Sequence, residues 1–131
     1  MKRFFLLLSA LVLTVAAHAA DKNTVVLRPG DIAYVRFENA GKKIRVANVS
    51  KEKDDAAQVI FNLSADPKDG LKMKVENNFP RDLLYKVELR SLRLKREMRA
   101  PSTPVVANKI AIETYPPMVE EIALYDFRLE K

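Results

Sequence analysis

The alternation of apolar and polar side chains is the feature of this sequence that most limits its possible folds. In the run Leu71-Lys72-Met73-Lys74-Val75-Glu76, each apolar residue is followed by a charged one. Successive side chains of a β-strand point to opposite faces of a sheet, so this period of two predicts a strand with one buried and one solvated face. A second stripe runs from Ala57 to Ala65 and is interrupted only at Ile60. Both runs favour an antiparallel sheet.

Turn residues separate such runs at intervals of about ten residues, which is typical of an all-β sandwich or barrel. Pro29-Gly30-Asp31, Asn39-Ala40-Gly41-Lys42 and Asp66-Pro67-Lys68-Asp69-Gly70 have the residue types that tight turns require. We therefore expect an all-β, two-layer antiparallel β-sandwich of about 7–8 strands. The expected strands cover residues 24–28, 32–39, 43–50, 57–65, 71–77, 83–96, 105–114 and 119–130.

Two of the expected strands change their alternation midway. In the strand over 83–96, the apolar residues up to Leu89 share one face, whereas Leu92 and Leu94 fall on the other. This predicts a β-bulge near Arg90-Ser91, or a bend that carries the strand from one sheet to the other. In the strand over 119–130, Ile122 and Leu124 have one phase and Tyr125, Phe127 and Leu129 have the opposite phase, which predicts a second bulge.

The stretch from Val75 to Leu89 has a strand that ends in Asn77, a polar turn, and a strand with the pattern Leu-x-Tyr-x-x-x-Leu around Tyr85. It resembles a stretch of about fifteen residues in many immunoglobulin-like domains of bacterial envelope proteins. The resemblance implies that the asparagine and the turn join one sheet to the other, and that the tyrosine is structural. The chain has neither the cysteine pair nor the tryptophan of antibody-type domains. The resemblance implies a fold and no activity.

The first nineteen residues match a bacterial secretory signal peptide. A positive start at Met1-Lys2-Arg3 precedes an apolar segment from Phe4 to Val15, and Ala17-His18-Ala19 has small residues where signal peptidase reads the chain. A membrane anchor would need about 20 apolar residues, and this run is shorter. We expect cleavage between Ala19 and Ala20, a single domain over 20–131, and a location in the periplasm or outside the cell.

The residue types limit the available chemistry. The only histidine is His18 and there is no cysteine, which excludes Ser-His and Cys-His nucleophiles and the usual zinc ligand sets from the processed chain. Neighbouring carboxylates such as Glu120-Glu121 point to opposite faces of a strand, and all three glycines belong to turns. We therefore expect no enzyme activity, no metal and no cofactor. The weakest alternative is a small hydrolase with a carboxylate centre or with a Ser-Lys pair such as Ser91 and Lys95.

A run of five basic residues is the one surface feature with a candidate binding role. After removal of the signal, the chain has 23 − 2 = 21 basic and 17 acidic residues, a modest surplus. Clustered arginines can bind phosphates or carboxylates, whereas basic residues on an edge strand can instead prevent pairing with another sheet. The candidate partner-binding or anion-binding residues are Arg90, Arg93, Lys95, Arg96 and Arg99.

These observations favour a non-catalytic interaction module of the bacterial periplasm. We expect it to bind another envelope protein through a sheet face or by adding a strand at a sheet edge. In the alternative hypothesis, the strand from Arg90 to Arg99 binds an anionic envelope polymer or a lipid head group. We expect no nucleic-acid partner, and no stable membrane insertion after cleavage.

Overall fold

The computed structural model describes residues 23–68 and 70–130. The predicted signal peptide over 1–19 and its cleavage between Ala19 and Ala20 lie outside these residues. No helix of the described part is long and apolar enough to cross a membrane.

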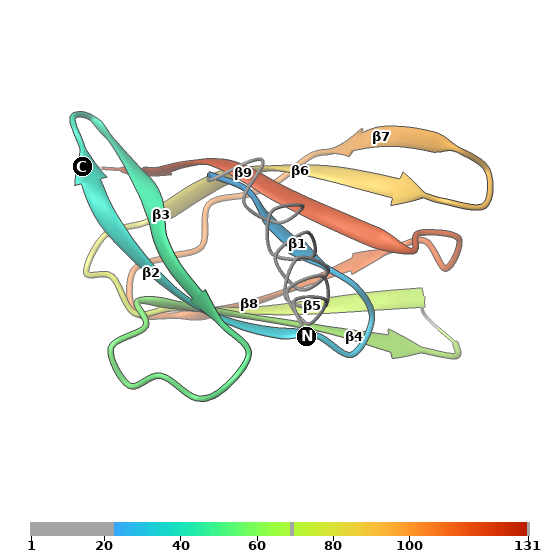
Figure 1. The fold of residues 1–131 in the computed structure, drawn as a ribbon, viewed down its shortest axis with the longest axis horizontal. Coiled ribbons are helices and arrows are strands. Elements are labelled where there is room, and N and C mark those ends of the chain that lie inside the picture. Colours follow the sequence, from blue (N-terminus) through green and yellow to red (C-terminus); the bar gives the residue numbers. More distant parts are fainter. Residues whose placement is uncertain (1–22, 69, 131) are drawn as a thin grey trace, which may run out of the picture.

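The described residues form nine strands in two antiparallel sheets that face each other as an open sandwich (Figure 1). The first sheet has the order β1-β9-β6-β7 and the second has the order β3-β2-β4-β5-β8. The strands are β1 (Val25–Leu27), β2 (Ile32–Ala40), β3 (Lys43–Ser50), β4 (Val59–Asp66), β5 (Gly70–Asn77), β6 (Leu83–Ser91), β7 (Arg96–Ala100), β8 (Ile110–Tyr115) and β9 (Glu121–Leu129). The predicted all-β, two-layer antiparallel architecture is confirmed.

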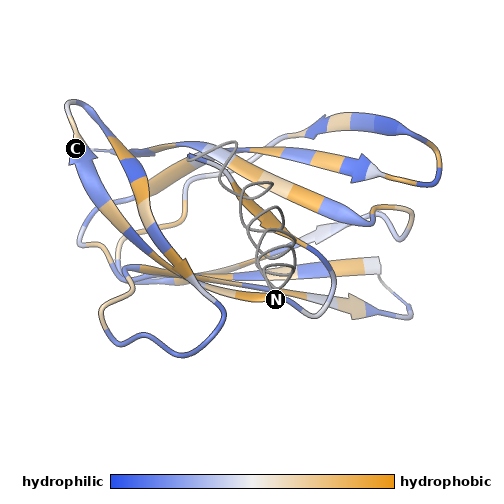
Figure 2. Cartoon of the chain, in the orientation of Figure 1, coloured by the Kyte–Doolittle hydropathy of each residue, from blue (hydrophilic) through white to orange (hydrophobic). Residues whose placement is uncertain are grey.

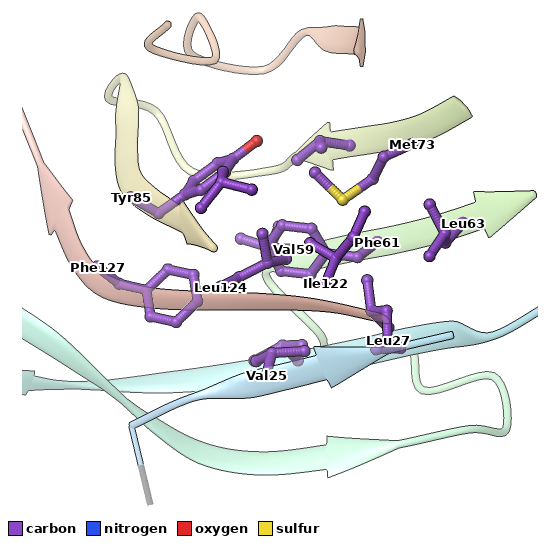
Figure 3. Packing of buried hydrophobic residues seen from close by; sticks show 14 of the residues in the cluster. Val25, Leu27, Val59, Phe61, Leu63, Met73, Tyr85, Ile122, Leu124 and Phe127 are labelled. Atoms are coloured by element: carbon purple, nitrogen blue, oxygen red, sulfur yellow. The ribbon is translucent and has the colours of Figure 1, made fainter. Parts of the chain in front are cut away.

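The two sheets are joined by apolar side chains from their facing surfaces, among them the aromatic rings of Phe61, Tyr85 and Phe127 (Figure 3). Phe37 of β2 and Phe61 of β4 belong to the second sheet, while Tyr85 of β6 and Phe127 of β9 belong to the first. The centroids of Phe37 and Phe127 are 4.9 Å apart with the rings edge-on, and those of Phe61 and Tyr85 are 5.8 Å apart. Such pairs add about 0.5–1.5 kcal/mol to the area that they bury.

The hairpin of β2 and β3 reaches across to the first sheet at the end of β9 (Figure 1). Lys43 at the start of β3 donates a hydrogen bond to Asp126 of β9 at 2.9 Å. The hydrophilic and hydrophobic bands that alternate along β6 in Figure 2 follow the period of two expected for a half-buried strand.

The turn that follows Asn77 carries the chain from the second sheet to the first. The Asn77 side chain is 1% exposed, and its Nδ2 donates to the carbonyl oxygens of Arg81 at 3.0 Å and Val105 at 2.9 Å. Its Oδ1 accepts a hydrogen bond from the backbone N–H of Phe79 at 2.9 Å. The amide therefore satisfies backbone groups of two loops where β5 gives way to β6, as expected of this asparagine.

The predicted strand over 83–96 is wrong, because it is a hairpin within the first sheet. β6 ends at Ser91, which pairs with Arg96 of β7, and the four residues between them form the turn. Leu92 and Leu94 lie in this turn and are 48% and 50% exposed, so neither belongs to the buried face of a strand. The predicted bulge or change of sheet near Arg90-Ser91 does not occur, and the described residues form nine strands where about 7–8 were expected.

The predicted bulge in the last strand is confirmed. Leu84 of β6 pairs with Arg128, and Lys86 pairs with Tyr125, so β9 has one residue more than β6 over this stretch. Within the bulge, Asp126 has a left-handed backbone conformation, with a φ of 56°. The bulge restores the inward direction of the side chains, and Leu124 and Phe127 are both buried.

The predicted strand over 105–114 covers two separate structures. Val105 forms an isolated bridge with Leu83 of the first sheet, and a turn with Asn108 in the left-handed region follows. β8 begins only at Ile110 and pairs with β5 of the second sheet. The prediction is therefore wrong for 105–109, because Val105 pairs with the first sheet and the chain then turns before it joins the second.

Candidate functional site

The five basic residues of the sequence prediction are divided among β6, the turn after it, and β7. Arg93 and Lys95 lie in the exposed turn. Arg90 of β6 follows the buried Leu89 and so lies on the outer face of the first sheet. On β7, Arg99 pairs with Glu88 and shares that outer face, whereas Arg96 pairs with Ser91 and lies on the other side. The hairpin therefore does not bring all five side chains to one face.

Arg90 is the centre of an ion-pair network on the outer face. Its Nη1 donates to Glu121 of β9 at 3.0 Å and its Nε donates to Glu88 at 3.0 Å, while Glu97 of β7 lies 3.7 Å away. Glu121 also accepts a hydrogen bond from Arg28 at 3.2 Å. Burial lowers the pKa of the Arg90 guanidinium, but the hydrogen bonds to the carboxylates outweigh it and raise the pKa above its usual value. Its charge is thus already neutralised within the fold.

Three of the four edge strands in the described part of the chain have features that prevent further pairing. β1 is only three residues long. β3 has the charged residues Lys43 and Arg45, and Ala47 is an extra residue opposite β2. β7 has Arg96, Glu97 and Arg99 among its five residues. Short edges, charged side chains and bulges are the devices that prevent edge-to-edge association.

β8 is the fourth edge strand, and it has two exposed isoleucines instead. Ile110 is 56% exposed and Ile112 is 67% exposed, the two highest values among the exposed large hydrophobic residues of the described chain. They alternate with Ala111 and Glu113, so both lie on the outer face of the second sheet. They pair with Glu76 and Lys74 of β5 respectively, and no strand formed by residues 23–68 or 70–130 pairs with them on the other side.

The backbone of β8 has hydrogen-bonding groups directed away from the sheet. The N–H of Asn77 donates to the carbonyl oxygen of Lys109 at 3.0 Å, which fixes the phase of the β5–β8 ladder. In an antiparallel pair, hydrogen-bonded and non-hydrogen-bonded positions alternate. The N–H and C=O groups of Ile110, Ile112 and Thr114 therefore point outward. They are positioned to pair with an additional strand.

The inner side of β8 has a carboxylate that two tyrosines bind. Glu113 accepts a hydrogen bond from the Tyr85 hydroxyl at 3.2 Å and another from the Tyr115 hydroxyl at 2.8 Å. Burial, together with the charge of Glu113, raises the pKa of both tyrosines, so both hydroxyls stay protonated and donate. This cluster ties β8 to β6 of the opposite sheet and holds the edge strand in place.

A hollow of about 340 Å³ lies on the outer face of the first sheet, and its charged groups bind one another or their neighbours. It is lined in part by Glu88, Arg90 and Asp126. Asp126 accepts from Lys43 at 2.9 Å and lies 3.3 Å from Lys86. The hydrogen bond from Lys43, with help from Lys86, lowers the pKa of Asp126 below its usual value in spite of burial. The described residues contain no group of three potential metal ligands.

Comparisons with protein-family models, with curated proteins and with solved structures found no match. The exposed edge at β8 was not predicted from the sequence, although Ile110 and Ile112 alternate with Ala111 and Glu113. That pattern was the available signal, but the strand order that makes β8 an edge depends on pairing with distant residues.

Proposed function

We propose that this chain is a non-catalytic interaction module of the bacterial cell envelope that binds a partner protein by adding a strand to β8. We also propose that its sandwich is immunoglobulin-like and that the processed chain works in the periplasm. The main support for strand addition is that β8 is an edge strand. Its outward N–H and C=O groups are positioned for pairing, and two of its isoleucines are exposed.

Strand addition explains why β8 differs from the other edges. An added strand gains affinity from main-chain hydrogen bonds and gains specificity from alternate side chains. Ile110 and Ile112 present those alternate contacts on one face, flanked by Glu76 and Lys74 of β5. Full burial of one such side chain contributes about 1.5–3 kcal/mol, so covering half of each exposed surface contributes about 1 kcal/mol per residue. Two such isoleucine contacts and a few main-chain hydrogen bonds would give β8 a specific, moderate affinity for the added strand.

The alternative of an anion-binding basic strand has less support. Arg90 is held by Glu88 and Glu121, and Glu97 places a negative charge between the arginines of β7. Arg93 and Lys95 in the turn are the residues through which such binding would act. Binding of that kind weakens steeply with salt, whereas strand addition through isoleucines does not.

The test is capture of proteins from envelope extract with the tagged chain, compared with variants of one residue. Ile112→Lys replaces the apolar contact, and Ile112→Pro removes the outward N–H while leaving the β5 ladder intact, since the residue 112 N–H is not used there. Leu94→Lys is the matched control, because Leu94 is 50% exposed in the turn between β6 and β7, which belong to the sheet that does not contain β8. Thermal unfolding of each variant establishes that it is folded.

The proposal expects a protein, identified by mass spectrometry, that the wild type and Leu94→Lys retain in both low and high salt. Both Ile112 variants should lose it. Retention by the folded Ile112 variants would contradict strand addition at β8. Loss in high salt, together with loss in a variant reversed at Arg93 and Lys95, would instead support the anion-binding alternative.

A further inference from the structure

We infer that the strand added to β8 is, in one assembly of this protein, β8 of a second copy, forming a symmetric antiparallel dimer. This inference depends on the proposed use of β8 as an open edge. Two copies of one edge strand related by a two-fold axis pair antiparallel, and such an interface uses the same surface on both copies. The sequence of β8 and the residue before it fits that arrangement.

The outward backbone groups allow two central registers. If the two-fold axis passes beside Ala111, Ile110 lies opposite Ile112 of the second copy, and each such pair exchanges two main-chain hydrogen bonds. If the axis passes beside Ile112, that residue meets its own copy, and Ile110 lies opposite Thr114. The first register unites all four isoleucines on the outer face, because side chains directly opposite each other in a ladder are in contact.

The charges on the inner face favour the same register. With the axis beside Ala111, Lys109 lies opposite Glu113 of the second copy, and the reciprocal pair forms on the other side of the axis. These are non-hydrogen-bonded positions, where opposite side chains approach most closely. In the other register Glu113 lies opposite Ala111 and no charges are matched. Charge complementarity therefore selects the register centred on Ala111.

The small side chain at the axis completes the fit. Ala111 pairs with itself, and its methyl group does not obstruct the close approach of non-hydrogen-bonded positions, about 4.5 Å between Cα atoms. On the outer face, four side chains form a row across the interface. The row begins with Glu76 and Ile110 of one copy and continues with Ile112 and Lys74 of the second, so its two ends carry opposite charges. The two five-stranded sheets would join into one continuous sheet. An interface of one short strand per copy is at the small end of specific interfaces, so we expect a reversible dimer.

The experiment uses the absence of cysteine from this chain. A disulfide requires Cα atoms about 4.4–6.8 Å apart, which the pair at position 111 satisfies in the dimer. Ala111→Cys should therefore form a disulfide-linked dimer under mild oxidation, about tenfold faster than Thr114→Cys, whose two copies lie far apart along the ladder. Ile112→Cys distinguishes the registers, because only the rival register places position 112 opposite itself.

Sedimentation equilibrium of the cysteine-free chain tests the same dimer without a cross-link. The mass should rise from monomer toward dimer as the concentration approaches about 1 mM, and Lys109→Glu and Ile112→Lys should both keep the chain monomeric, whereas Leu94→Lys should not. A monomer at every concentration, or cross-linking of Ile112→Cys in preference to Ala111→Cys, would overturn the inference. Either result leaves the capture experiment to decide separately whether β8 accepts a strand from another protein.

Discussion

Replacement of Asn77 by alanine should destabilise the fold because this one buried side chain bonds four backbone groups. The carbonyl oxygen of Val105 also accepts from the N–H of Leu83 at 2.9 Å, so it keeps a partner in the variant. The carbonyl oxygen of Val106 likewise keeps a partner, because it accepts from the N–H of Lys109 at 3.0 Å. The N–H of Phe79 loses its acceptor, and the carbonyl oxygen of Arg81 loses its donor. Each buried group left unsatisfied costs about 1–3 kcal/mol, and both groups are only partly buried.

The expected loss for Asn77→Ala is therefore about 2–3 kcal/mol in the free energy of unfolding. For a domain of this size, that loss lowers the melting temperature by roughly 8–15 °C. Urea unfolding followed by circular dichroism measures the free energy directly, and the slope with urea should be unchanged. Asn48→Ala is the control, because Asn48 is exposed on β3 and should change the stability by less than about 0.5 kcal/mol. An equally small effect at Asn77 would refute the reasoning.

Three further changes test other parts of the fold. Gly70→Ala should cost about 3 kcal/mol in urea unfolding, because the φ of Gly70 is +86° and an added Cβ would clash with the carbonyl oxygen of Tyr115. Asp126→Asn should lower the melting temperature at neutral pH. Because its two lysines lower the pKa of Asp126 in the folded state, this stabilisation is fully present above the ordinary value of 3.8 and is lost as the pH falls from there through the lower folded pKa. The difference from the wild type should therefore shrink progressively in melts at pH values below 3.8. Arg90→Ala should lower the free energy of unfolding by about 1–2 kcal/mol, because the buried carboxylate of Glu121 loses its bond to Arg90. Arg93→Ala should leave the free energy of unfolding unchanged in the same urea unfolding assay.

The parts of the fold that were predicted from the sequence are those that depend on local alternation. β5 was expected over 71–77 and is found over Gly70–Asn77, because its apolar residues face one sheet surface throughout. The bulge of β9 was predicted because two buried phases in one strand require an extra residue between them. In both cases, neighbouring residues contain all the information that the prediction needs.

The strand predictions were wrong where apolar residues lie in a turn or where the chain passes from one sheet to the other. Leu92 and Leu94 continued the alternation of β6 but lie in a turn that closes with Lys95 in the left-handed region, at a φ of 53°. Glycine or asparagine usually marks such a position, and lysine gives no signal. The edge position of β8 was equally hidden, because strand order depends on pairing between residues far apart in the chain.

Amide hydrogen exchange resolved along β8 shows directly whether this strand presents an open edge that accepts another strand. In dilute solution, the N–H groups of Ala111 and Glu113 should exchange slowly, because they are bonded to β5, and those of Ile110, Ile112 and Thr114 should exchange fast. When a strand is bound, the three fast amides should become protected. Uniformly slow exchange along β8 in the dilute chain, or no added protection on binding, would contradict the account.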